Sequence, residues 1–251
     1  MCDLFSELVG CDGLLILSVG ALLAGVVRGF AGFGTAMIYL PFAGLVLMPF
    51  SALTTLIVKD LVAPLIHVPR ALRDGQPRDL VWLMAGAVFF VPLGVWVLSR
   101  VDADIFRWGV SLVTFAMLTV LILGVRYTGL ITRPLTLGAG AMGGFLAGSV
   151  GLPGPPVILL YMASTLSAAT IRATLTLYLI LADLLMLGVL GWNGFIVPAA
   201  LLLGAAMIVP YLLGNWLGAA LFRPEYELLY RRIAYAIIAG SAIMGLPIWR
   251  G

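Results

Sequence analysis

The amino-acid sequence predicts an all-α polytopic membrane protein that consists of two inverted repeats. Hydrophobic residues make up 63% of its 251 residues and charged residues only 10%. A soluble fold of this length cannot bury so much apolar surface, whereas a lipid bilayer solvates it. Two Gly- and Pro-rich interruptions, at residues 25–35 and 144–154, break the apolar sequence. Paired interruptions in the two halves of a membrane chain are typical of a transporter's binding site.

The glycines of the two interruptions align at one constant offset: Gly25, Gly29 and Gly32 correspond to Gly144, Gly148 and Gly151. Thr55 and Thr174 match at the same offset. The glycines that precede each break are four residues apart, a spacing that favours close packing of two helix backbones. Pro153 and Pro155, in contrast, cannot continue a helix without disrupting it. We therefore interpret the upstream glycines as packing positions and each break as part of the site.

The apolar sequence divides into ten segments, which we expect near residues 14–30, 35–48, 51–69, 80–98, 105–124, 135–150, 155–164, 170–190, 194–218 and 229–248. A helix needs about 20 apolar residues, with a range of about 17–25, to cross the hydrocarbon core. The segments at 35–48, 135–150 and 155–164 are shorter and flank a break. We interpret them as half-helices or re-entrant hairpins, and each repeat then has one Gly/Pro-broken re-entrant or half-helix pair plus about three full transmembrane helices. Membranes tolerate such irregular backbone where it faces protein or water.

The positions of the arginines predict how the chain is oriented across the membrane. Eight of the arginines lie in or beside three loops: Arg70, Arg73 and Arg78; Arg126 and Arg133; and Arg223, Arg231 and Arg232. The positive-inside rule places these loops in the cytoplasm. The acidic segment 1–12 is then extracytoplasmic and has no basic residue typical of a signal peptide.

The repeats are expected at 13–130 and 131–251. Each contributes five segments, an odd number, so the two halves are inverted relative to each other. The alternative counts each broken segment as one crossing, which gives eight spans and parallel halves. That version places the loop at 223–232 on the opposite side from the loop at 70–78.

Other classes of protein find little support. Cys2 and Cys11 form no metal or redox motif, and we expect no metal and no cofactor. The net charge of +3 is spread over short loops, so no nucleic acid partner is expected. The chain has one histidine and neither HExxH nor GxSxG, which argues against an enzyme.

In these features the chain resembles the sulfite exporter TauE/SafE family. Members have a glycine-rich turn in each half, followed by an apolar run and a proline. Residues 32–36 and 151–155 occupy those places, although Thr35-Ala36 and Pro153 depart from the family's run of glycines. The resemblance spans nearly the whole chain. It implies a permease that moves sulfite, sulfonates or related small anions outward across a bacterial inner membrane.

Two adjacent charges inside segment 51–69 are the strongest site candidates. Lys59 is the only lysine of the chain, and Asp60 follows it. Each such charge costs about 2.5–3.5 kcal/mol at the bilayer centre on insertion scales. Pro64 removes the hydrogen bond that the Asp60 carbonyl would accept. The alternative is that Lys59 extends to the membrane surface while Asp60 caps a neighbouring helix.

Other charged residues are candidates for substrate binding or proton coupling, and most of them also have a purely structural interpretation. Arg28, at the first break, either binds an oxyanion or marks a cytoplasmic helix end. Arg172 either contacts substrate or is an orientation charge. Asp183 is embedded and suits a proton carrier. His67 either relays protons or lies at the interface.

The predicted substrate-binding set is Arg28, Gly32, Phe33, Gly34, Thr35, Lys59, Gly151, Leu152, Gly154 and Arg172, and the proton-coupling or charge-balancing set is Asp60, Asp183 and His67. We hypothesise alternating access around a midplane anion site where the two breaks meet. The alternatives are a carrier or channel for another small organic anion and a membrane assembly protein without transport. Expected partners are the small anion and membrane lipid, and a homodimer is left open.

Overall fold

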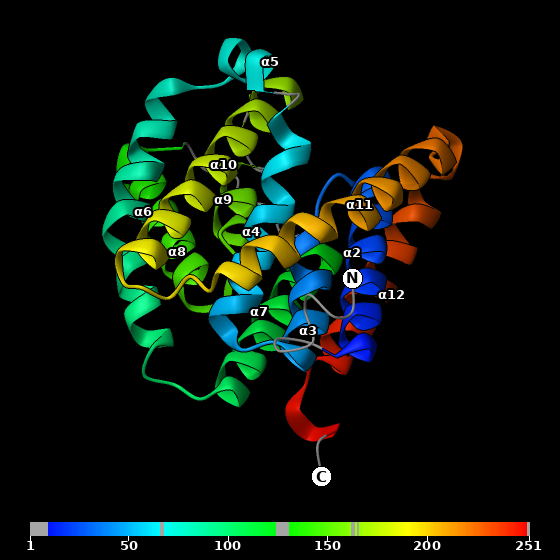
Figure 1. Ribbon diagram of the computed structural model, residues 1–251. Helices are drawn as coiled ribbons and strands as arrows, with labels where there is room; N and C mark the ends of the chain where they lie inside the picture. Colours follow the sequence, from blue (N-terminus) through cyan, green and yellow to red (C-terminus); the bar gives the residue numbers. More distant parts are fainter. Residues whose placement is uncertain (1–9, 66–67, 124–130, 162–163, 165, 250–251) are drawn as a thin grey trace. The chain divides into compact units, whose positions relative to one another are not determined.

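The computed structural model describes residues 10–65, 68–123, 131–161, 164 and 166–249, and every structural statement below concerns these residues (Figure 1). Their regular secondary structure is helical throughout, which confirms the predicted all-α class. The helices are α2 (Cys11–Ala31), α3 (Thr35–Val46), α4 (Pro49–Leu65), α5 (Val68–Asp74), α6 (Pro77–Leu98), α7 (Ala103–Leu123), α8 (Arg133–Val150), α9 (Gly154–Tyr161), α10 (Ala168–Trp192), α11 (Pro198–Leu221) and α12 (Glu227–Met244), with short 3-10 turns at Pro224–Tyr226 and Pro247–Trp249.

Five of the described helices, α2, α6, α7, α10 and α11, are long and apolar enough to cross a membrane. The bent pair α4 and α5 would make a sixth span if it crosses as one unit. The large hydrophobic side chains that these helices leave exposed, such as Phe89 at 76% and Leu112 at 59%, suit a lipid surface. The chain is therefore a multi-pass membrane protein.

Most predicted segments coincide with helices to within a few residues. As predicted, α3 and α9 are short, with 12 and 8 residues. α8, with 18 residues, is longer than expected and reaches the lower end of the spanning range. α11 begins at Pro198 rather than at residue 194, because proline suits the first position of a helix.

The segment predicted at 51–69 requires a correction. The structure ends α4 at Leu65 and places a separate helix, α5, at Val68–Asp74. Pro69, in the first turn of α5, has no backbone N–H and so cannot donate the hydrogen bond to the Leu65 carbonyl that one continuous helix would require. His67 lies outside the described residues.

The chain divides into two compact units, and the division into repeats at 13–130 and 131–251 stays a prediction. Unit 1 contains residues 1–60, 102–118 and 195–251, and unit 2 contains residues 61–101 and 119–194. Each unit thus combines helices from both sequence halves. The inversion of the two halves stays a prediction.

In unit 1, glycines bring α2 and α11 into backbone contact. A Cβ atom at Gly29 would lie 2.7 Å from the Ala219 nitrogen, and one at Gly214 would lie 3.0 Å from the Val26 nitrogen. Real Cβ atoms essentially never approach other atoms closer than about 3.0 Å, so larger residues would push the helices apart. α3 packs against both α2 and α12 in the same unit.

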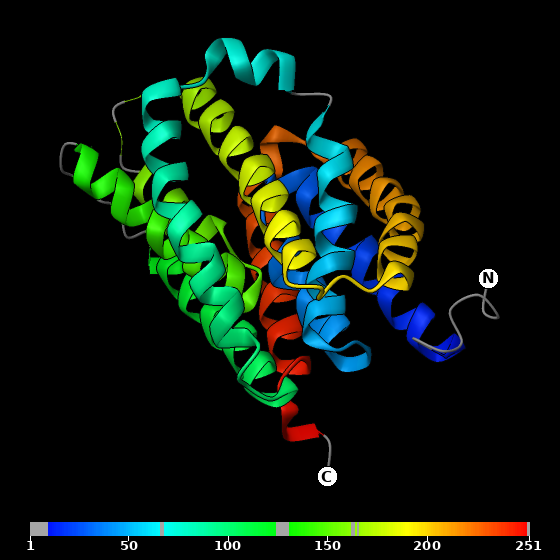
Figure 2. The same cartoon turned by 60° about the vertical axis from the view of Figure 1, so that its left-hand side comes forward.

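In unit 2, α6 and α8 make the corresponding contact and lie side by side in both views (Figures 1 and 2). A Cβ atom at Gly144 would lie 2.7 Å from the Ala87 Cα, and one at Gly148 would lie 2.7 Å from the Val95 nitrogen. The interpretation of the upstream glycines as packing positions is therefore confirmed in both units.

We expect Gly148→Ala to lower the free energy of unfolding by about 1–3 kcal/mol, because the added methyl group forces α6 and α8 apart. Gly138→Ala is the matched control in the same helix. A Cβ atom at Gly138 meets nothing within 4 Å, so this change should leave stability equal or raise it by up to about 1 kcal/mol. Unfolding of the detergent-solubilised variants measures both effects. Equal stability of the two variants would contradict the packing role of Gly148.

Candidate functional site

The first break joins α2 to α3 through two glycines with positive φ. Gly32 ends α2 with φ 78°, and its N–H donates to the Arg28 carbonyl at 2.8 Å. Gly34 precedes α3 with φ 94°. Residues with a side chain rarely adopt such angles, so glycine is favoured at both positions. One helix thus stops and the next begins within a few residues, as predicted.

The second break begins in the same way. Gly151 ends α8 with φ 72°, and its N–H donates to the Ala147 carbonyl at 3.0 Å. α9 then begins at Gly154. Gly151, Leu152 and Gly154 are all buried, whereas at the first break Gly32 is exposed and Gly34 half-buried. The two predicted breaks are confirmed, but they differ in their exposure.

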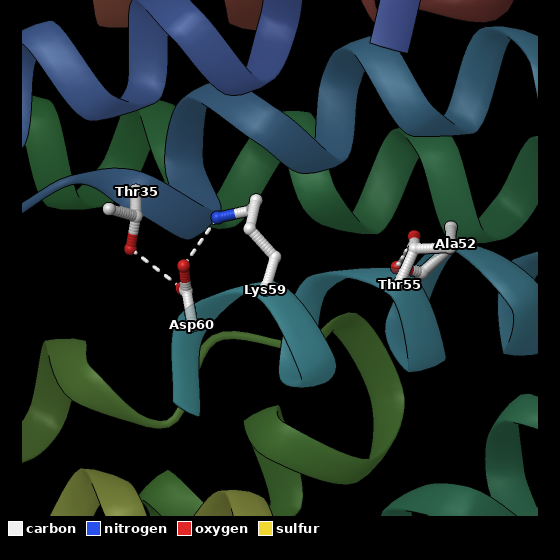
Figure 3. Close-up of polar contacts among 5 residues, drawn as sticks. All are labelled: Thr35, Ala52, Thr55, Lys59 and Asp60. Atoms are coloured by element: carbon white, nitrogen blue, oxygen red, sulfur yellow. Dashed lines mark hydrogen bonds and ion pairs between the residues drawn. The ribbon is translucent and has the colours of Figure 1, made fainter. Parts of the chain in front are cut away.

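Lys59 and Asp60 form an ion pair beside the first break (Figure 3). Lys59 Nζ donates to Asp60 Oδ1, and Thr35 Oγ1 donates to Asp60 Oδ2 at 2.8 Å. The Lys59 side chain is 0% exposed and that of Asp60 is 13% exposed. Adjacent positions on a helix point about 100° apart, so pairing did not follow from the sequence. The long lysine side chain closes this gap.

Two tyrosine rings flank the Lys59 ammonium group. Nζ lies 4.8 Å from the ring centroid of Tyr39 and 4.1 Å from that of Tyr211. Both tyrosines are fully buried. A desolvated cation gains about 2 kcal/mol or more over an aromatic face. The two rings and the carboxylate together offset the cost of removing this charge from water.

Helix packing places both rings. Tyr39 lies one turn after Thr35 on α3, so the two share a face of that helix. Tyr211 comes from α11, which Gly25 of α2 lets approach closely: a Cβ atom at Gly25 would lie 2.8 Å from the Asn215 nitrogen. The packing glycines of unit 1 therefore also position the ring over the ammonium group.

The N-terminus of α3 adds a partial positive charge to the cluster of Lys59, Asp60 and Thr35. The first N–H groups of a helix have no acceptor within the helix, and its N-terminus carries roughly half a positive charge. Thr35, the residue that binds Asp60, is the first residue of α3. The cluster therefore combines an ammonium group, a hydroxyl group and a helix N-terminus around one carboxylate. Groups of these three kinds are ones that proteins also use to hold oxyanions.

The remaining predicted residues lie in different places. Arg28 is half-buried in the last turn of α2, where a cation also stabilises the end of its own helix. Phe33 is half-buried between the two glycines of the first break. Arg172 is exposed near the start of α10, and Asp183 is half-buried three turns further along the same helix. Their binding roles stay predictions.

Sequence reasoning missed Tyr39 and Tyr211. A signal existed for Tyr39, because it follows Thr35 by one helical turn. No local signal identifies Tyr211, which is far away in the sequence and lies in an apolar helix where aromatic residues are common. Only the packing of α11 brings it to Lys59.

The fold and this site define a polytopic membrane protein that buries an ion pair beside a broken helix. A protein-family model described as sulfite exporter TauE/SafE matches residues 17–245, nearly the whole chain, and the chain therefore belongs to this family. The resemblance inferred from the glycine-rich breaks is thus confirmed. Searches of curated proteins and of solved structures found no match. Family membership and the apolar helices together identify a membrane transport protein.

Proposed function

We propose that the protein exports a small sulfur-containing oxyanion, sulfite or an organosulfonate, across the bacterial inner membrane by alternating access. The observation that carries this proposal is the Lys59 ammonium group, fully buried beside the start of α3 in a chain of the sulfite exporter family. A cation without access to water is costly unless it has an anionic partner. In a transporter that partner can be exchanged for substrate.

The oxyanion takes the place of the Asp60 carboxylate on Lys59. Both present negatively charged oxygen atoms to Nζ, and Asp60 is the partly exposed member of the pair. The Thr35 hydroxyl and the first N–H groups of α3 donate to the remaining substrate oxygens. Two anions beside one cation repel each other, so the arriving substrate displaces the Asp60 carboxylate from Lys59. When substrate leaves, the carboxylate returns and neutralises the site.

The other predicted residues support this cycle. Arg28 offers a guanidinium group that matches two oxygens of a sulfonate or sulfite. In unit 2, the backbone groups of Gly151, Leu152 and Gly154 stay the predicted binding groups of the second break by itself. Asp183 and His67 are candidates for moving the coupling proton, and Arg172 for attracting the anion from the aqueous side.

The membrane potential favours export. Moving one negative charge out of a cell at −100 mV releases about 2.3 kcal/mol. A monoanion therefore leaves without further energy input, whereas its uptake requires coupling to protons. The runner-up function is a carrier or channel for another small organic anion.

The test is flux in proteoliposomes that contain the purified protein. The vesicles are loaded with sulfite, short sulfonates, sulfate or acetate, and efflux is followed under an imposed potential. We expect saturable efflux of sulfite or a sulfonate that speeds up when the same anion is present on the opposite side. Protein-free vesicles are the control. Unsaturable efflux would indicate a channel, and preference for acetate would overturn the sulfur substrate.

A further inference from the structure

Tyr178 in unit 2 carries a hydroxyl group that the protein does not satisfy. The residue lies on α10 and is 0% exposed. Its hydroxyl finds no hydrogen-bond partner among the described residues. An unsatisfied buried polar group costs about 1–3 kcal/mol, so such groups in folded proteins require an explanation. Tyr161 of the same unit shows the usual arrangement, because its hydroxyl donates to Asp79 Oδ2 at 2.7 Å.

The hydroxyl lies at the second break. A Cβ atom at Gly143 of α8 would overlap the Tyr178 hydroxyl oxygen, and it would lie 2.7 Å from the Pro153 carbonyl and 3.4 Å from a methyl group of Val157. Pro153 directly precedes α9, and Val157 is in its first turn. The absence of a side chain at Gly143 thus leaves room for the hydroxyl at the start of α9.

This helix start has few hydrogen-bond donors of its own. α9 begins Gly154-Pro155-Pro156, and neither proline carries a backbone N–H. α3, at the first break, begins Thr35-Ala36-Met37 and keeps all three N–H groups. The backbone of the second break is therefore a poorer anion-binding site than that of the first. Tyr178 brings a donor to the place where the prolines have removed two.

The repeat gives Tyr178 a counterpart. It follows Thr174 by the same number of residues as Lys59 follows Thr55, and Thr55 and Thr174 match at the constant offset of the two breaks. Lys59 and Tyr178 are both fully buried, each beside the break of its own unit. Lys59 supplies a cation at the first break, and Tyr178 supplies a neutral hydroxyl donor at the second.

We propose that the Tyr178 hydroxyl donates a hydrogen bond to an oxygen of the transported oxyanion at the second break. This inference rests on the proposed function. A neutral donor selects for oxygen acceptors and adds no charge, so it contributes to recognition without holding the anion too strongly for release. The Pro153 carbonyl beside it is an acceptor and favours a substrate oxygen that carries a proton, as in hydrogen sulfite.

The test compares Tyr178→Phe with wild type in proteoliposomes, with sulfite as the probe. Removing the hydroxyl should raise the sulfite concentration at half-maximal flux by about tenfold or more, the size of one hydrogen bond to a charged group. The unfolding temperature without sulfite should stay equal or rise, because an unsatisfied group leaves the core. The stabilisation that added sulfite gives in detergent should shrink.

Tyr161→Phe is the matched control, since it removes a hydroxyl that the protein already satisfies. We expect it to lower the unfolding temperature and to leave the half-saturating sulfite concentration unchanged. Wild-type sulfite flux together with an unchanged half-saturation in Tyr178→Phe would overturn the role of Tyr178 and leave the proposed function standing. Absence of any sulfur oxyanion flux in wild type would overturn both.

Discussion

Replacing Lys59 with methionine should reduce the initial rate of sulfite efflux from proteoliposomes by at least about 100-fold. Methionine has a similar length and fits between the two tyrosine rings, but it carries no charge. Removing one partner of a buried charge pair typically costs about 2–5 kcal/mol in binding, and each 1.4 kcal/mol is a factor of ten. Efflux at saturating and limiting sulfite separates a loss of binding from a loss of turnover.

Two variants serve as controls for this experiment. Arg133→Gln removes a cation from an exposed position at the start of α8 and should leave efflux within about twofold of wild type. Lys59→Met combined with Asp60→Asn removes the whole ion pair, so it tests whether a neutral, folded protein still transports. We expect it to be inactive. Robust efflux from either Lys59 variant would remove Lys59 from the binding site.

The second large effect concerns stability. Lys59→Met alone should lower the free energy of unfolding by about 3 kcal/mol. This is the lower end of the loss of about 3–5 kcal/mol that follows when one partner of a buried ion pair is removed, because the Asp60 side chain is 13% exposed. The carboxylate then stays at the start of α3 with only Thr35 as a described side-chain partner. Detergent-solubilised variants, unfolded under identical conditions, provide the measurement.

Adding Asp60→Asn to Lys59→Met should restore most of this loss, to within about 1 kcal/mol of wild type, because both charges are then gone. Asp60→Asn alone completes the double-mutant cycle, and the coupling energy follows from the four stabilities. A coupling energy near zero would contradict the ion pair. A double variant as unstable as Lys59→Met would show that the lysine side chain matters through packing rather than through charge.

The positions of the helices were largely predictable, because hydrophobic length and helix-breaking residues act locally. The two breaks could be located because Gly32 and Gly151 stand at one constant offset and both adopt positive φ in the structure. The split of segment 51–69 into α4 and α5 was missed, although Pro69 carried a local signal for it. The segment is apolar over a length that can span a membrane, which favoured one continuous helix.

The residues of the site were only partly predictable. Lys59 and Asp60 were identified because they are charged residues within an apolar segment. Thr35 was identified because it lies at the first break. Their arrangement was not, since the direction of a lysine side chain depends on what surrounds it. Tyr211 and Tyr178 were missed for a related reason: an aromatic residue in an apolar helix looks the same in sequence whether it faces lipid or a charge.

The sequence by itself therefore determined the membrane class, the approximate positions of most helices, the two breaks and the family, because each depends on residues close together in the chain. Only the tertiary structure decided which side chains meet. The Tyr211 ring reaches Lys59 because glycines let α2 and α11 touch, and the Tyr178 hydroxyl reaches the second break because Gly143 leaves space for it. Such contacts join segments far apart in the sequence. Whether they form depends on the close approach of packed helices, which local patterns do not encode.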